Sequence, residues 1–121
     1  MRFSKDHEWA ELNGGIAKIG ITDFAQHALG DIVFVEFPNV GSTISVGKAF
    51  GSVESVKAVS DLYAPISGKV LRVNEELDAT PELLNENPHE NWIIEIEASN
   101  LGEMDELMDN EAYEDFCARE A

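Results

Sequence analysis

The sequence is poor in cysteine, in basic residues and in long apolar runs. Cys117 is the only cysteine, so the chain has no internal disulfide and no thiolate zinc site. Only 8 residues are Lys or Arg, which argues against nucleic acid or an anionic membrane as a partner, because phosphate neutralisation needs clustered cations. No run approaches the roughly 18 apolar residues of a membrane span, and the first residues lack the apolar stretch of a signal peptide. We therefore expect a cytoplasmic protein, or the mature form of an organellar one.

Acidic residues are abundant, and apolar residues are numerous enough for a core. The chain has 24 acidic residues, a formal net charge of −16 and 44% apolar residues in a length of 121. The apolar content predicts a folded globule, and the length predicts a single domain over 1–121. The charge favours a highly soluble protein that docks onto basic patches of its partners, since electrostatic steering raises the rate of encounter.

Short β-rich segments, broken by Gly and Pro, dominate the first hundred residues. Segments of this length and spacing favour a small sandwich or barrel, so the predicted fold class is mainly β. One brief helix is predicted over 23–29, capped by Thr22 or Asp23 and ended by Gly30. The predicted strands are 16–21, 31–37, 42–46, 48–53, 59–64, 68–73 and 92–97.

Two other regions predict helix. A helix start is expected at Thr80, because this capping residue is followed by Pro81 in the first turn. The end of the chain predicts a helical C-terminal appendage over 101–121, with a second segment capped by Asp109 or Asn110. Its apolar residues are expected on shared faces: Leu101, Met104, Leu107 and Met108 in the first segment, and Ala112, Tyr113 and Phe116 in the second.

The segment around Lys57 reads as a hairpin. Apolar residues recur there every third position, which would also suit a helix, but Gly51 and Pro65 lie too close and β-branched residues are dense. We therefore predict a hairpin with Lys57 at or near its tip. Composition and spacing alone describe this lysine as an ordinary surface amine.

Several ordered segments give the chain a closer resemblance. The sequence is similar to the glycine cleavage system H protein family over nearly its whole length, and the segment around Lys57 resembles the lipoyl-attachment hairpin of that family. The matching segments, in order, are DHEW (6–9), GITDFAQHALGDIVFVEFP (20–38), ESVKAVSD (54–61), YAPISGKVLRVN (63–74), PELLNENP (81–88) and MDELMDNEAYEDF (104–116).

The resemblance implies a non-catalytic carrier. Lys57 would bear lipoate in amide linkage, on a flattened barrel-sandwich hybrid like those of lipoyl and biotinyl carrier domains. Three working partners are implied: a pyridoxal-phosphate glycine decarboxylase, a folate-dependent aminomethyltransferase and a dihydrolipoamide dehydrogenase. A lipoate-attaching enzyme would modify the chain first. An arm of about ten bonds from the lysine Cα should reach on the order of 12 Å.

A loaded arm needs protection from water, and the resemblance implies a cleft for it. The residues matching Glu8 and Asp61 line that cleft, with Asp6 as a further candidate. An acid there would receive the cationic amine, and apolar walls would exclude water. Glu54, near the attachment hairpin, is another candidate cofactor-binding residue. Without the resemblance, Glu8 is one carboxylate among 24 acidic residues.

Two other functions stay open at this point. The chain could be a lipoyl relay adaptor that serves other lipoate-dependent complexes. It could also be a small acid–base enzyme built on His7, Glu8 and Asp61, although it has no glycine-rich phosphate loop, no metal-spaced cluster and no nucleophile–base pair. A structural or surface role is expected for His7, and Cys117 is expected to be a passive thiol.

Overall fold

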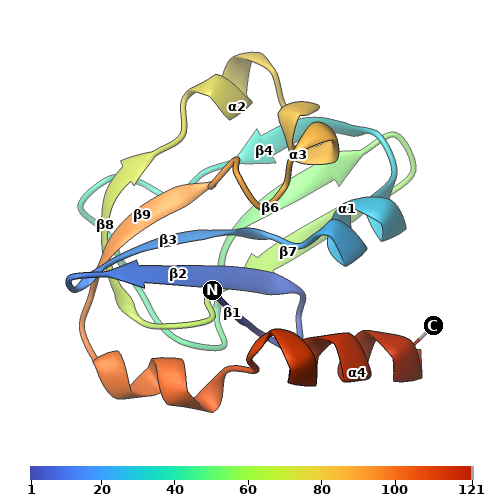
Figure 1. Cartoon of the computed structure of the whole chain (residues 1–121). Helices are drawn as coiled ribbons and strands as arrows, with labels where there is room; N and C mark the ends of the chain where they lie inside the picture. The colour runs from blue at the N-terminus through green and yellow to red at the C-terminus, as the bar shows by residue number, and fades with distance from the viewer. Residues whose placement is uncertain (121) are drawn as a thin grey trace.

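The computed structural model describes residues 1–120 and consists mainly of β-strands (Figure 1). Ala121, the last residue of the predicted appendage, lies outside the described residues. The strands are β1 (Arg2–Phe3), β2 (Glu8–Asn13), β3 (Ile16–Ile21), β4 (Ile32–Glu36), β5 (Thr43–Ile44), β6 (Ala49–Ser55), β7 (Val59–Tyr63), β8 (Gly68–Val73) and β9 (Ile94–Ala98). The prediction of a mainly β fold is confirmed.

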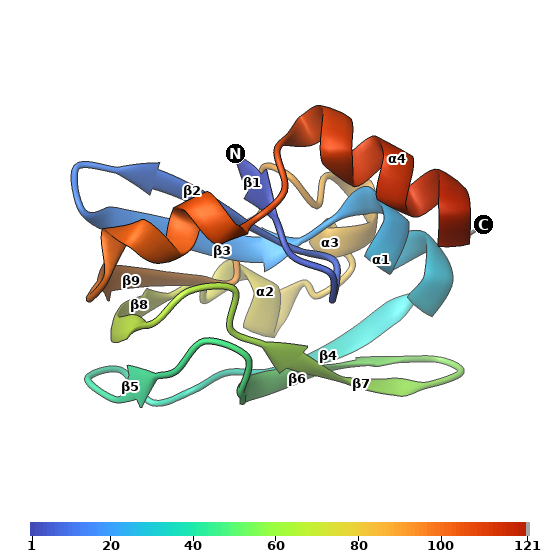
Figure 2. The ribbon, with the colours of Figure 1, turned by 90° about the horizontal axis from the view of Figure 1, so that it is seen from below.

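The strands form two antiparallel sheets that do not close into a barrel. The larger sheet has the order β1-β2-β3-β9-β8-β5, and the smaller has the order β4-β6-β7. Figure 2 shows β4, β6 and β7 of the smaller sheet in a layer apart from β2, β3 and β9 of the larger sheet. One apolar core joins the layers: Ile19 and Ile96 of the larger sheet and Val35, Val53 and Leu62 of the smaller sheet belong to the same buried cluster. The core therefore fixes the smaller sheet, and its hairpin, on the larger one.

Local chemistry accounts for helix α1 (Asp23–Leu29), which has the predicted bounds. The Thr22 hydroxyl accepts a hydrogen bond from the Ala25 N–H at 3.2 Å, which caps the first turn. Gly30 ends the helix with φ 79°, a left-handed conformation that glycine adopts without strain. This helix leads straight into β4 and so brings its C-terminal end to the smaller sheet.

The predicted helix start at Thr80 is wrong. Thr80 instead ends α2 (Glu76–Ala79), because its N–H donates to the Glu76 carbonyl. The next helix, α3 (Leu83–Glu86), begins after Glu82. Pro81 therefore lies in the turn between two short helices, and their buried residues Leu77 and Leu84 decide where each one packs. The sequence also gave no prediction of β1, β2 or α2.

The C-terminal tail is helical, as predicted. It consists of a 3₁₀-helix (Leu101–Glu106) and α4 (Asn110–Glu120), and the Asp109 carboxylate caps α4 by accepting from the Ala112 N–H at 2.8 Å. Only the later part of the first segment reaches the core: Met104 and Leu107 pack against it, whereas Leu101 is 53% exposed. The expectation that Leu101 shares the buried face is therefore wrong. None of the helices in residues 1–120 is long and apolar enough to span a membrane.

Candidate functional site

The attachment hairpin, which we define as β6, β7 and the turn 56–58, presents Lys57 to solvent at its tip. Ser55 organises this turn: its N–H donates to the Ala58 carbonyl at 2.8 Å, and its hydroxyl accepts from the N–H groups of Ala58 at 3.1 Å and Lys57 at 3.3 Å. The backbone under Lys57 is thus held by local hydrogen bonds. The predicted position of Lys57 at a hairpin tip is confirmed, and its amine is exposed.

The tip of the hairpin is tied to the end of α1. The Val56 N–H donates to the Asp31 carbonyl at 3.0 Å. A Cβ placed on Gly30 would lie 3.5 Å from the Lys57 Cε, so the aliphatic part of the lysine runs close to the glycine at the helix end. Figures 1 and 2 show the tip of the hairpin next to the loop that follows α1. The tip of the hairpin is thus bonded to the end of α1, and Lys57 itself is exposed.

Glu8 lies in a different environment, at the start of β2. It is 2% exposed. One carboxyl oxygen accepts from the Ser4 hydroxyl at 2.8 Å, and the other accepts from the Tyr63 N–H at 3.2 Å. Burial raises the pKa of Glu8 to about 8, and the nearby Asp6 charge adds to the rise, while the two hydrogen bonds oppose it. Among residues 1–120 no Lys, Arg or His forms a salt bridge with this carboxylate.

The other predicted carboxylates are less enclosed. Asp6 and Asp61 are exposed, and Glu54 is half-buried on β6, opposite Phe34 and Val59. Asp61 lies on β7, two residues before Tyr63, so the two side chains point to the same face of the strand. The structure thus brings Glu8 against the end of β7, and Asp61 lies two residues nearer the tip of the hairpin. It places no hydrogen bond between Glu8 and Asp61.

A cavity of about 260 Å³ lies beside the Glu8 turn, which we define as residues 4–8. Ser4 and Asp6 of this turn line it, together with the residues after β7 and the tail. The Ser4 hydroxyl also donates a hydrogen bond to the Glu8 carboxyl, so this one residue separates the cavity from the buried carboxyl. The lining residues are Phe3, Ser4, Lys5, Asp6, Val46, Gly47, Ala64, Pro65, Glu103, Glu106, Leu107 and Met108.

His7 is occupied by structural contacts. Its ring stacks on Phe24 with the centroids 4.3 Å apart, Nδ1 lies 2.7 Å from the Tyr113 hydroxyl, and Nε2 lies 3.2 Å from a Glu120 carboxylate oxygen. These contacts face α1 and α4. They support a structural role for His7 and give no support to the acid–base enzyme built on His7, Glu8 and Asp61.

Sequence reasoning missed four contributors to this region. Ser4 and the Tyr63 N–H hold the Glu8 carboxyl, Gly30 supports the stem of Lys57, and Tyr113 contacts His7. The spacing of four residues between Ser4 and Glu8 was the one available signal for Ser4. The other three contacts join residues at least 27 positions apart, so only the fold brings them together.

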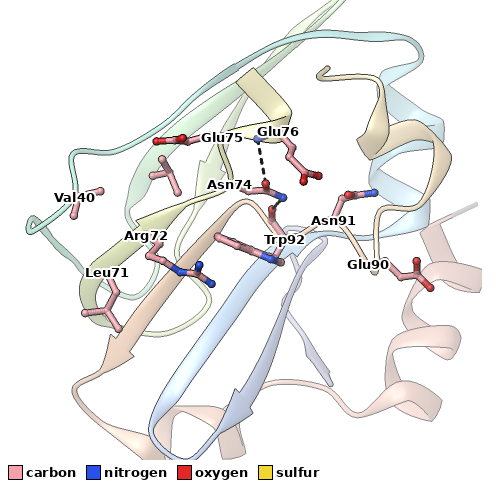
Figure 3. A pocket seen from close by; sticks show the side chains of 10 residues that line it. Val40, Leu71, Arg72, Asn74, Glu75, Glu76, Glu90, Asn91 and Trp92 are labelled. Carbon is pink, nitrogen blue, oxygen red and sulfur yellow. Dashed lines mark hydrogen bonds between the residues drawn. The ribbon is translucent and has the colours of Figure 1, made fainter. Parts of the chain in front are cut away.

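A second, larger cavity is lined by residues of β8, the start of α2 and the segment before β9. It measures about 590 Å³ and is lined in part by Arg72, Asn74, Glu75, Glu76 and Trp92 (Figure 3). Its central polar groups are already paired. The Asn74 amide donates to the Trp92 carbonyl at 2.8 Å and accepts from the Glu76 N–H at 3.3 Å.

The cation of this larger cavity is paired as well. The Arg72 guanidinium lies 5.1 Å from the centre of the Trp92 ring and donates two hydrogen bonds to Glu95, at 3.2 and 3.1 Å. None of Lys57, Glu8, Asp61 or Glu54 lines this cavity. We therefore place the candidate site at the attachment hairpin and the Glu8 turn.

The sequence matches a known protein family over almost its full length. The family model described as glycine cleavage H-protein matches residues 1–120. The chain belongs to this family.

Relatives of the H-protein family are similar over almost the full chain. The glycine cleavage system H protein of Alkaliphilus oremlandii is 60% identical over 119 residues, which cover 98% of this chain and 94% of the relative. The mitochondrial glycine cleavage system H protein 2 of Arabidopsis thaliana is 51% identical over 121 residues, covering 99% and 78%. A crystal structure of the H protein from Mycobacterium marinum has a TM-score of 0.84 at 35% identity and covers 98% of this chain and 94% of that one. Membership of the family places the chain in the glycine cleavage system as a lipoyl-carrier component.

Proposed function

We propose that the chain bears lipoate on Lys57 and shuttles the aminomethyl group of glycine between enzymes. It would accept this group from the pyridoxal-phosphate glycine decarboxylase and deliver it to the folate-dependent aminomethyltransferase. The resulting dithiol would then be reoxidised by dihydrolipoamide dehydrogenase. The observation that carries this proposal is the exposed Lys57 amine, held at the tip of a hairpin whose sequence matches the attachment hairpin of the family.

The residues around Lys57 suit a covalent arm. Lipoate supplies a long chain that ends in a disulfide, a combination that no natural side chain offers. Lys57 contributes the amine that is acylated, and the hydrogen-bonded turn at Ser55 supports it on a rigid element, where a site is positioned more precisely than on a loop. Acylation removes one positive charge, so 7 basic and 24 acidic residues remain and the formal charge moves from −16 to −17.

Distance supports a route from Lys57 along the hairpin toward Glu8. The four residue steps from Lys57 to Asp61 span at most about 13 Å. This is close to the reach of about 12 Å expected for the arm. An arm lying along β7 would therefore reach Asp61, and the Tyr63 N–H, which holds the Glu8 carboxyl, lies two residues further on. Glu54, on the neighbouring strand, would flank the start of this route.

Glu8, held at the Tyr63 end of β7, is suited to hold the amine. With a pKa of about 8 the buried group is mostly a neutral acid at pH 7, and a cationic amine beside it would favour the ionised form. Its two partners, the Ser4 hydroxyl and the Tyr63 N–H, are neutral donors, so the ionised carboxylate has capacity left for a cation. A charge-assisted hydrogen bond there contributes about 1.5–3 kcal/mol. Asp61 is exposed and would add a weaker attraction, because solvent screens it. The proposed role of both carboxylates is to hold the amine and slow its hydrolysis.

The carrier proposal can be tested by mass and by turnover. The chain is incubated with lipoate and a lipoate-attaching enzyme, and its intact mass is measured. We expect one added lipoyl group, and the modified chain should support decarboxylation of glycine by the pyridoxal-phosphate enzyme. A chain that accepts lipoate but fails with all three glycine cleavage enzymes would favour the relay adaptor. A chain that accepts no lipoate would contradict both.

Two broader predictions accompany the carrier proposal. We propose that residues 1–121 act as one carrier domain, since one apolar core joins both sheets and the tail packs on it through Met104 and Leu107. The cytoplasmic or organellar location stays a prediction from the sequence. Relatives of both origins occur, in bacteria and in plant mitochondria.

A further inference from the structure

His7 has a backbone conformation that needs support. Its φ of 66° is the only positive value at a non-glycine residue in the described chain, residues 1–120. A side chain in this left-handed region costs on the order of 1 kcal/mol or more, and such residues persist where surrounding contacts determine them. His7 is the residue immediately before Glu8, so its conformation sets the direction in which the Glu8 carboxyl leaves the turn.

Backbone bonds alone define the Glu8 turn only in part. The His7 N–H donates to the Ser4 carbonyl at 3.1 Å, and the Ser4 N–H donates to the Glu8 carbonyl at 2.8 Å. The His7 carbonyl in turn accepts from the Thr22 N–H at 3.1 Å. The turn is therefore bonded to the residue that caps α1. None of these backbone bonds holds the His7 side chain, which points from the turn toward α4.

The Tyr113 hydroxyl holds that side chain. It lies 2.7 Å from His7 Nδ1 and 2.6 Å from the Thr22 hydroxyl, so it can donate to one and accept from the other. Thr22 is fully buried, and Tyr113 is 6% exposed. The Tyr113 ring also stacks on Phe3, with centroids 4.5 Å apart and planes 10° from parallel. The hydroxyl and the ring thus make separable contributions, because a phenylalanine would keep the stacking and lose only the hydrogen bonds.

The geometry points to a positioning network for the proposed cleft. We propose that His7, Thr22 and Tyr113 form a buried network through which the C-terminal helix α4 fixes the Glu8 turn and so positions the Glu8 carboxyl for the cationic end of the arm. This inference rests on the proposed function for its purpose, but not for its structural part. The Tyr113 hydroxyl is bonded to His7 and Thr22, and the Glu8 carboxyl is bonded to Ser4 and Tyr63, so Tyr113 would act through His7 and is a positioning residue.

The network is also connected to the attachment hairpin through α1. Thr22 caps α1, and Gly30 at the far end of the same helix supports the stem of Lys57. One short helix therefore joins the network to the attachment lysine. Buried polar groups that lose a partner are costly, so removal of the Tyr113 hydroxyl is expected to disturb both Thr22 and His7.

The test is a titration of the Glu8 side chain by carbon-13 NMR in the unlipoylated full chain. In the wild type we expect a midpoint near pH 8, because burial raises this pKa. Tyr113→Phe should loosen the turn, admit water to the carboxyl and lower the midpoint by about one unit or more, since less desolvation lowers an acid's pKa. A lower melting temperature with an unchanged Glu8 midpoint would overturn the inference, because Tyr113 would then serve stability alone.

Matched variants distinguish loss of a network hydrogen bond from other changes nearby. Asp115→Asn changes an exposed charge on α4 and should leave the midpoint unchanged. Thr22→Ser keeps the buried hydroxyl and should titrate like the wild type, whereas Thr22→Val should lower the midpoint. If Tyr113→Phe fails to fold, the Thr22 pair gives the same answer: equal midpoints for Ser and Val would overturn the network.

The outcome can be told apart from failure of the carrier proposal. The titration uses no lipoate and no partner enzyme, so it reports on the position of Glu8 whether or not Lys57 is modified. A chain that accepts no lipoate, with a lowered midpoint in Tyr113→Phe, would contradict the carrier proposal and keep the network. Normal lipoylation of the chain, together with an unchanged Glu8 midpoint in Tyr113→Phe, would support the carrier proposal and contradict the network.

Discussion

The attachment hairpin and the Glu8 turn differ in how they are held. Lys57 is exposed on a turn closed by hydrogen bonds within four residues, 55–58. Glu8 is buried, and its carboxyl is bonded to a residue 55 positions away. The hairpin is a local structure that leaves Lys57 exposed. The turn is a tertiary structure that keeps the Glu8 carboxyl group from water. In the proposed carrier, exposure during transfer and protection in transit would thus belong to two environments of opposite kind.

The largest expected effect comes from removing the amine. Lys57→Arg keeps the charge and much of the length but offers no amine for acylation. We expect complete loss of lipoylation, measured by intact mass and by tandem mass spectrometry of a digest. Lys48→Arg changes another exposed lysine and should be lipoylated like the wild type. Any lipoylation of the Lys57→Arg chain would show that the exposed hairpin is not the sole attachment site.

The next effect concerns Glu8, the buried carboxyl group, and the pH dependence of the free energy of unfolding. The pKa of Glu8 is raised in the folded chain from 4.5 to about 8, so the folded state binds this proton more tightly than the unfolded state. Its contribution to the free energy of unfolding is therefore fully present below pH 4.5 and is lost as the pH rises through 8. The full loss is at most about 5 kcal/mol, from about 1.4 kcal/mol for each unit of pKa shift.

Glu8→Gln isolates this contribution. Glutamine keeps an acceptor for the Tyr63 N–H but has no proton to lose, so the decline in stability between pH 5 and 9 should be smaller than in the wild type. Asp61→Asn, at the exposed carboxylate, should keep the wild-type decline. Urea unfolding at several pH values measures the three slopes. Parallel slopes for wild type and Glu8→Gln would mean that Glu8 ionises in the fold as readily as an exposed acid.

A third effect compares the two carboxylates in the loaded protein. Glu8→Gln should speed the spontaneous release of ammonia about tenfold to hundredfold, because a buried charge-assisted hydrogen bond is lost. Asp61→Asn should change the rate by about threefold or less, since solvent screens the exposed charge. The initial rate of loading should barely change in either variant. Identical decay in wild type and in the double variant would remove both carboxylates from the mechanism.

The smallest expected effect concerns docking of the decarboxylase onto the exposed surface near Lys57. Near Lys57 the surface combines apolar Val56 and Val59, which are 70% and 66% exposed, with a chain of net charge −16. Raising the salt concentration from about 50 to 500 mM shortens the screening length from roughly 14 to 4 Å. The apparent KM of the decarboxylase for the carrier should therefore rise about threefold or more.

The control for salt inhibition is dihydrolipoamide dehydrogenase acting on free lipoamide. A carrier KM that stays constant within about twofold over this range would contradict electrostatic docking. Recognition would then rest on the apolar residues around the hairpin, and the acidic charge would serve solubility.

The elements that could be predicted from the sequence are those held by local contacts, and the elements that could not be predicted depend on distant ones. Helix 23–29 was predicted with its cap and its end, because Thr22 and Gly30 act on their own neighbours in the chain. The start at Thr80 was wrong because the burial of Leu77 and Leu84 placed the short helices there. Strand β2, with Glu8, was not predicted, since its pairing with β3 and β1 depends on residues on both sides of it.

The sequence by itself determined the family, the mainly β fold and the lysine at the tip of a hairpin. Each of these depends on ordered motifs or on the short-range chemistry of turns and caps. Only the tertiary structure decided that Glu8 is buried while Asp61 is exposed, and that Tyr113 lies between His7 and Thr22. The physical reason is that desolvation and hydrogen bonding depend on every group that packs around an atom, and here those groups come from segments up to 106 residues apart.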